Sequence, residues 1–150
     1  MKVLVVDDDA GVRKFLRRIL TENGIESFEA AGGEEGLSVA GFWKPDLILL
    51  DLEMPDLKGN EVVRRLKAAP ATAAIPVIIL TAHATRENLI ELASAGAADF
   101  MVKADLRPDE LVVRAHRATG TVAPAQPPPA RPVPAGPAPK AGSPLKREEV

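Results

Sequence analysis

The 150-residue chain contains no cysteine, no tyrosine and one tryptophan. Without cysteine it forms no disulfide and no thiolate metal site, and the redox state of its compartment is left open. Its formal net charge at pH 7 is only −2, which excludes a generally basic surface for nucleic acid or anionic lipid. We therefore expect protein or small-molecule partners and no direct contact with nucleic acid.

Long apolar runs are also missing. Met1 leads directly into a short apolar run at residues 3–6, and polar residues follow it. This pattern is neither a signal peptide nor a membrane-spanning segment. We expect a cytoplasmic protein without membrane insertion.

Large apolar residues become scarce beyond Gly120, where nine prolines alternate mainly with alanines. Such a segment has too little to bury to form a core of its own. The sequence predicts one folded domain in residues 1–119 and an extended, disordered Pro/Ala-rich tail in residues 120–150.

Apolar runs and amphipathic segments alternate through the first 119 residues. The pattern predicts strands at 2–6, 25–30, 47–50, 75–80 and 99–102, and helices at 10–23, 33–41, 60–68, 86–95 and 108–119. Strands that alternate with helices at this spacing indicate an α/β fold, with a parallel sheet, right-handed crossovers and helices on both faces.

The first helix is expected to be amphipathic, with Asp9 as its cap. Its buried face would carry Val12, Phe15, Leu16, Ile19 and Leu20, and its outer face Arg13, Lys14, Arg17 and Arg18. The basic outer face is either plain solvated surface or part of a docking surface.

The strand at 47–50 is apolar at four consecutive positions and ends in Asp51. A strand of this kind lies in the middle of a parallel sheet, covered on both faces. Its carboxyl end is then at the sheet edge where α/β proteins bind ligands. We take the Asp51 carboxylate as the candidate reactive group.

Other strands deliver polar groups to the same edge: Asp7 and Asp8, Thr81, and Lys103. Two carboxylates about 5 Å apart repel by roughly 3 kcal/mol at an effective dielectric near 20, so the acids need a cation or raised pKa values. Oxygen ligands of this kind suit Mg²⁺. A phosphoryl group would then find a nucleophile in Asp51, a donor in Thr81 and a fixed cation in Lys103.

Four segments carry a family resemblance. They read Val-Val-Asp-Asp-Asp at 5–9, Asp-Leu-Glu-Met-Pro-Asp at 51–56, Ile-Leu-Thr-Ala at 79–82 and Phe-Met-Val-Lys at 100–103. In this order they resemble the signature segments of bacterial response regulator receiver domains, of the stand-alone type found in chemotaxis. The resemblance covers about residues 1–119 and implies a flavodoxin-like sheet of strand order 2-1-3-4-5.

The resemblance also implies roles for single residues. Asp51 would accept a phosphoryl group from a sensor histidine kinase or phosphotransfer protein. Mg²⁺ would be held by Asp8, Asp51 and the backbone carbonyl of Glu53, with Asp7 acting through a metal-bound water. Thr81 and Phe100 would form the switch pair.

The expected output is a change of shape on the face made by residues 86–95, 99–102 and 108–119. Because no output domain follows in this sequence, a downstream protein would read that face. The chain would catalyse only its own phosphorylation and dephosphorylation. The oligomeric state is left open.

One position departs from the family pattern. Lys103 is followed by Ala104, where the family usually has proline, often after a cis peptide bond. A cis bond before a residue other than proline costs roughly 3 to 4 kcal/mol. We expect either a trans bond with an altered loop or a strained cis bond.

Two other functions use the same residues. In a haloacid-dehalogenase-like phosphatase, Asp7 would be the nucleophile and Asp9 the general acid, although Ala10 and Gly11 fit that motif poorly. A receiver that has lost phosphorylation would act as a docking module only. Taken singly, the acids at 7–9 and Thr81 are also explained by helix caps, Lys103 by a solvated loop and Phe100 by the core.

Overall fold

The computed structural model describes residues 1–120, in which five strands and five α-helices alternate. The elements are β1 (Lys2–Val6), α1 (Ala10–Glu22), β2 (Glu26–Ala30), α2 (Gly33–Trp43), β3 (Leu47–Asp51), α3 (Gly59–Ala68), β4 (Val77–Thr81), α4 (Arg86–Ala95), β5 (Asp99–Val102), a 3₁₀ turn (Lys103–Asp105) and α5 (Pro108–Thr119). All strands are parallel, in the order β2-β1-β3-β4-β5. The α/β, flavodoxin-like fold is thereby confirmed, and the tail expected at 120–150 lies, apart from Gly120, outside the described residues.

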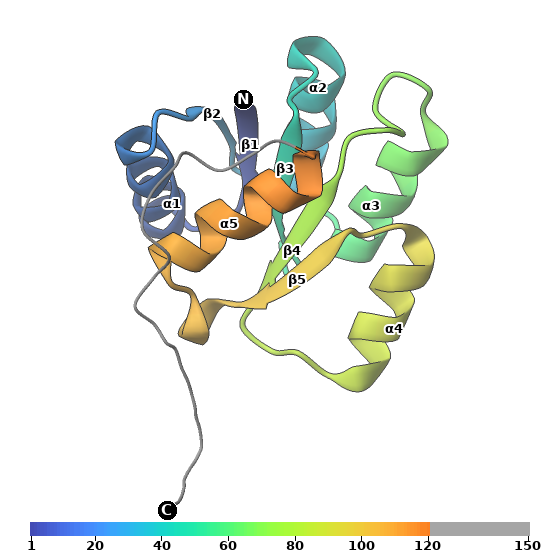
Figure 1. The fold of residues 1–150 in the computed structure, drawn as a ribbon. Coiled ribbons are helices and arrows are strands. Elements are labelled where there is room, and N and C mark those ends of the chain that lie inside the picture. Colours follow the sequence, from blue (N-terminus) through green and yellow to red (C-terminus); the bar gives the residue numbers. More distant parts are fainter. Residues whose placement is uncertain (121–150) are drawn as a thin grey trace, which may run out of the picture.

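Helices cover both faces of the sheet (Figure 1). Helices α1 and α5 pack on one face, and α2, α3 and α4 on the other. Alternate side chains of each strand enter opposite cores, so Val3 and Val5 face α1 and α5 while Leu4 and Val6 face the other layer. This double burial explains why the central strands read as unbroken apolar runs.

Two element boundaries differ from the expected ones by two residues, and the others by one residue at most. Helix α2 continues beyond Gly41 to Trp43, whose ring stacks on Phe28 of β2 at 4.9 Å between ring centroids. Strand β4 begins only at Val77, because Pro76 has no N–H to donate and contributes its carbonyl alone, to the N–H of Ile48 at 3.0 Å. In both cases contacts with a neighbouring strand set the boundary.

Helix α1 is capped as expected, since Asp9 Oδ1 accepts hydrogen bonds from the N–H groups of Gly11 and Val12 at 2.8 and 3.3 Å. The predicted faces are partly wrong. Phe15, expected inside, is 47% exposed. Arg13, expected on the solvated face, has a side chain only 16% exposed because it contacts the loop after β1.

No helix within residues 1–120 is long and apolar enough to cross a membrane.

Candidate functional site

The sheet register brings the polar strand ends together. Val6 pairs with Leu50, so the next residues, Asp7 and Asp51, are level on β1 and β3. Thr81 lies one residue beyond the level of Asp51 on β4, and Lys103 follows the partner of Thr81 on β5. Because the strands are parallel, all these residues lie at one edge of the sheet.

The Lys103 ammonium lies between two buried carboxylates. Its Nζ is 2.8 Å from Asp7 Oδ2 and 3.1 Å from Asp51 Oδ1. Asp7 is 1% exposed and Asp51 5% exposed, so neither acid has much water to offset the repulsion between them. The positive charge of Lys103 makes this arrangement of acids possible.

The pKa values of the two partners show which forces dominate. Burial raises the pKa of Asp51 above its ordinary value, the Lys103 hydrogen bond offsets only part of this, and the charge of Asp7 adds to it. Burial acts to lower the pKa of Lys103, but both carboxylates outweigh it, so this pKa lies above its ordinary value. Lys103 is therefore a fixed cation near neutral pH, whereas the ionised form of Asp51 is held at a cost.

The two buried acids differ in their free oxygens. Asp51 uses only Oδ1, for Lys103 and for the N–H of Glu53 at 3.4 Å, so its Oδ2 has no hydrogen bond within residues 1–120. Asp7 uses both, since Oδ1 accepts from the Asp9 N–H at 2.9 Å and Oδ2 binds Lys103. Asp51 is thus the buried acid with an oxygen available to attack.

Asp8 completes an acidic cluster. Carboxylate oxygens of Asp7, Asp8 and Asp51 lie within 4.8 Å of one another. The Asp8 side chain is exposed and forms no hydrogen bond or ion pair within the described part of the chain. Three carboxylates and one ammonium leave two negative charges when all are ionised, and the donors are all oxygens. This combination fits a hard divalent cation.

Thr81 and Phe100 lie on neighbouring strands. Thr81 is 1% exposed, and its hydroxyl donates to the His83 carbonyl at 2.8 Å and accepts from the His83 N–H at 3.1 Å. The hydroxyl is therefore engaged within its own loop. Phe100 is half-buried and packs against the core on the side of α4.

The loop after Lys103 has a trans peptide bond and an altered path, which is one of the two conformations expected from the missing proline. No peptide bond within residues 1–120 is cis, so the Lys103–Ala104 bond is trans. The chain instead turns through a short 3₁₀ segment, in which the Leu106 N–H donates to the Lys103 carbonyl at 3.3 Å. This loop still brings Lys103 Nζ to the two acids.

Asp56, which lies in the same loop as Glu53, has a role that was not predicted from the sequence. Its two carboxylate oxygens accept the N–H groups of Gly33 and Glu34, both at 3.0 Å, and so cap helix α2. These hydrogen bonds lower the pKa of Asp56. A signal was present in Gly32, because a glycine at the cap has no side chain for these donors.

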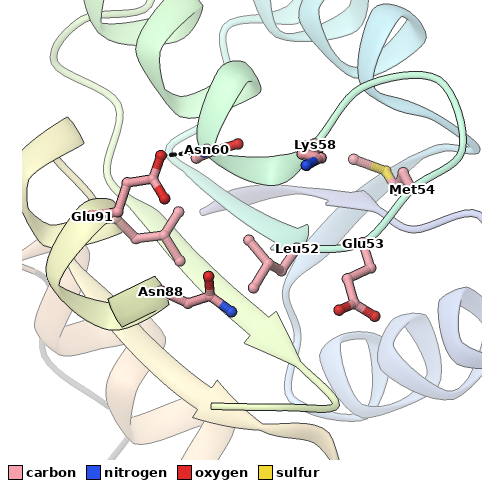
Figure 2. Close-up of a pocket in the computed structure, with 8 residues that line it drawn as sticks. Leu52, Glu53, Met54, Lys58, Asn60, Asn88 and Glu91 are labelled. Atoms are coloured by element: carbon pink, nitrogen blue, oxygen red, sulfur yellow. Dashed lines mark hydrogen bonds between the residues drawn. The ribbon is translucent and has the colours of Figure 1, made fainter. Parts of the chain in front are cut away.

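A hollow of about 280 Å³ lies beside the site, between the loop after β3 and helix α4 (Figure 2). It is lined by Leu52, Glu53, Met54, Lys58, Asn60, Asn88, Glu91 and Leu92. Helix α4 has only one buried residue, Leu92. Across the hollow, Asn60 of α3 donates to Glu91 of α4 (Figure 2). Leu92 is therefore the one side chain of α4 that is fully buried, while Glu91 pairs with Asn60 and, at 3.8 Å, with Arg64 of α3.

Comparison with known proteins identifies a family and several proteins to which this chain is similar. The family model of the response regulator receiver domain matches residues 3–116. The chain is 40% identical over 112 residues to the phosphate regulon transcriptional regulatory protein PhoB of Pseudomonas aeruginosa, covering 75% of this chain and 48% of PhoB. It is 42% identical over 101 residues to the KDP operon transcriptional regulatory protein KdpE of Escherichia coli, covering 67% of this chain and 44% of KdpE. The chain thus spans about half the length of these curated relatives.

Solved structures resemble it over nearly their whole length. The chemotaxis protein CheY4 of Vibrio cholerae is 31% identical with a TM-score of 0.74, and the match covers 78% of this chain and 97% of CheY4. The receiver domain of the Francisella response regulator 1452 is 34% identical with a TM-score of 0.72, covering 79% and 96%. The family match, the strand order and these likenesses together show that the chain belongs to the response regulator receiver domain family.

Proposed function

We propose that the chain is the phosphoacceptor of a two-component phosphorelay and that Asp51 takes up the phosphoryl group. One observation carries the proposal. Asp51 is a buried carboxylate at the end of a central strand, with Oδ1 held by the Lys103 ammonium and with Oδ2 free of hydrogen bonds from residues 1–120. The donor would be a phosphohistidine of a sensor histidine kinase or of a phosphotransfer protein.

Transfer would proceed by attack of Asp51 Oδ2 on phosphorus. The new P–O bond makes an acyl phosphate, and the P–N bond to the donor histidine breaks with its electron pair returning to the imidazole nitrogen. The Lys103 ammonium, 3.1 Å from Asp51 Oδ1, balances the negative charge that the phosphoryl group brings to Asp51. The fixed positions of both groups remove the need to reorganise the site during transfer.

The acidic cluster is proposed to hold Mg²⁺ through Asp8, Asp51 and the Glu53 carbonyl, with Asp7 acting through a water. When bound, Mg²⁺ neutralises the charge on phosphoryl oxygens. Two observations support this assignment: the site carries two excess negative charges, and the Asp8 carboxylate has no partner in the described part of the chain. Glu53 contributes only its backbone in this scheme, and its side chain lines the hollow (Figure 2).

The proposed switch begins at Thr81. To donate to a phosphoryl oxygen, its hydroxyl must release the His83 carbonyl, which loosens the loop before α4. Helix α4 can then shift at low cost, since Leu92 is its one buried residue, and the half-buried ring of Phe100 can turn inward. A 100-fold preference of the phosphoryl group for the shifted state, about 2.7 kcal/mol, would make a minor state of about 1% roughly half-populated.

The downstream protein would bind the face formed by α4, β5 and α5. Two exposed apolar residues support this choice, Ile90 on α4, 58% exposed, and Val113 on α5, 38% exposed. Both side chains would contribute apolar contact area to a protein that binds this face.

Phosphorylation can be tested with acetyl phosphate and Mg²⁺, read by intact mass. The wild-type chain is expected to gain one phosphoryl group and Asp51→Asn none, because the amide is not nucleophilic. Asp9→Asn is the matched control, since Asn caps a helix as well as Asp and Asp9 serves as the cap of α1. It should be labelled like the wild type.

Three results would contradict the proposal. Label on Asp51→Asn would place the nucleophile elsewhere. Steady hydrolysis of a phosphate ester, abolished by Asp7→Asn or Asp9→Asn, would favour the phosphatase. An unlabelled wild-type chain would favour the docking module.

A further inference from the structure

One side chain of helix α1 holds the backbone of the acidic turn. Arg13 Nη1 donates to the carbonyl oxygen of Asp7 at 2.7 Å, and Arg13 Nε donates to Glu29 Oε1 on β2 at 2.8 Å. The Arg13 side chain is 16% exposed. Its planar guanidinium thus bridges the turn and the edge strand with two fixed N–H donors, a geometry that the single ammonium of a lysine does not provide.

Glu29 neutralises the charge of Arg13. The Glu29 carboxylate also pairs with Arg17, one helical turn further along α1. Hydrogen bonds from Arg13 and then from Arg17 lower the pKa of Glu29, so it stays ionised. Arg13 therefore gives the Asp7 carbonyl a charge-assisted hydrogen bond while Glu29 on β2 compensates its positive charge.

Two further hydrogen bonds hold the backbone and the carboxylate of Asp7 in place. Its N–H donates to the Ala30 carbonyl at 3.1 Å, and its Oδ1 accepts from the Asp9 N–H at 2.9 Å. Asp8 has no side-chain partner of its own within residues 1–120. The Asp7–Asp8 peptide, whose oxygen Arg13 holds, therefore fixes the backbone from which the Asp8 carboxylate projects.

We propose that Arg13 is a positioning residue for the metal site: it fixes the Asp7–Asp8 peptide so that both carboxylates face Asp51 before a cation arrives. The inference rests on the proposed function, which places Mg²⁺ at these acids. Without Arg13, cation binding must also order the turn, and this cost lowers affinity. Groups that orient metal ligands typically change affinity by about 10-fold to 100-fold.

The test compares two arginines that share one partner. Arg13→Met removes the bond to the Asp7 carbonyl and one bond to Glu29. Arg17→Met, the matched control, removes a bond to Glu29 and a 3.3 Å bond to Ser27 Oγ, but none to the acidic turn, from a side chain 48% exposed. Mg²⁺ titration of the full chain by calorimetry is expected to show a Kd about 10-fold higher for Arg13→Met and changed less than about 2-fold for Arg17→Met.

A second measurement separates positioning from general stability. Urea unfolding without Mg²⁺ gives the stability of each variant, and a purely structural effect lowers the unfolding midpoint without changing the Kd of the folded chain. If Arg13→Met does not fold, Arg13→Lys replaces it. Lysine keeps the charge but has no fork to bridge Asp7 and Glu29, so a Kd raised several-fold is expected.

The measurements distinguish a failure of the positioning role of Arg13 from a failure of the proposed Mg²⁺ site. Equal Kd values for the Arg13 variant that folds and for Arg17→Met would overturn the positioning role. A wild-type chain that binds no Mg²⁺, or an Asp8→Asn variant that binds it as the wild type does, would overturn the metal site of the proposed function itself.

Discussion

The position of Asp51 in the fold disfavours its ionised form. It lies at the end of a strand that is buried on both faces, and burial raises its pKa more than the Lys103 hydrogen bond lowers it. The ionised carboxylate is therefore less stable in the folded chain than in water. A group with this destabilised charge next to a cation is typical of functional sites.

The stability of Asp51→Asn should reveal this cost. The wild-type acid has a folded pKa above its ordinary value of 3.8, so the folded state binds its proton more tightly than the unfolded state. Below pH 3.8 the acid is protonated in both states; as the pH rises through the folded pKa, the wild-type chain loses stability and the asparagine variant does not. We expect Asp51→Asn to be the more stable chain at pH 7 in EDTA.

Urea unfolding of both chains at pH 7 and near pH 4 measures the effect. The difference should shrink as the pH falls towards 4. Lys103 adds no pH dependence between pH 4 and 7, because the stability that its raised pKa contributes is fully present there and is lost only as the pH rises through that pKa in alkaline solution. A wild-type chain that is as stable as the variant at pH 7 would show that Lys103 fully compensates burial.

Helix α3 begins in direct contact with the end of strand β3. A Cβ atom on Gly59 would lie 2.8 Å from the Cα of Leu52 and 3.1 Å from the carbonyl oxygen of Asp51. The Gly59 N–H also donates to the Leu52 carbonyl at 2.8 Å. The backbone that carries the reactive acid is thus packed against the first residue of the helix.

Gly59→Ala is expected to destabilise the chain by about 1 to 3 kcal/mol, because backbone atoms must move to admit the methyl group. The same displacement should slow labelling from acetyl phosphate, since it shifts Asp51. Thermal unfolding and labelling rate measure the two effects.

Gly41→Ala provides the control. Gly41 is exposed within α2, and a Cβ there would meet no atom within 4 Å. Alanine favours a helix over glycine by roughly 0.5 to 1 kcal/mol, so this variant should gain stability and label normally. Similar behaviour of the two alanine variants would mean that α3 is not tightly packed on β3.

At the scale of the molecule, both cores and all the candidate site residues lie within residues 1–120. A cation that binds only the folded chain stabilises it by mass action. The proposed Mg²⁺ site therefore links the stability of the whole domain to a few carboxylates at one sheet edge.

We expect Mg²⁺ at 100 times its Kd to raise the free energy of unfolding by about 2.7 kcal/mol. Excess EDTA should reverse the gain, and Asp8→Asn should abolish it. A chain ending at Gly120 should show the same gain as the full chain. Urea unfolding with and without Mg²⁺ makes these comparisons, and a gain that needs residues 121–150 would place part of the site beyond the domain.

The sequence by itself determined the order of the elements and the placing of polar residues at strand ends. Both follow from local pattern, since an apolar run such as 47–50 predicts a buried strand whatever surrounds it. The acid or lysine that ends such a run then lies at the carboxyl edge of a parallel sheet. Asp51, Thr81 and Lys103 were placed in this way.

Only the tertiary structure decided which atoms face one another. Lys103 and Asp7 are 96 residues apart and meet through strand register, and Arg13 turns towards Asp7 because packing sets the rotation of α1 about its axis. The periodicity of α1 placed Arg13 in solvent. Gly32 indicated only that the cap of α2 needs a partner from another segment, and not that Asp56, more than 20 residues later, is that partner. Hydrogen bonds between distant segments depend on register and helix rotation, which packing of the whole chain fixes.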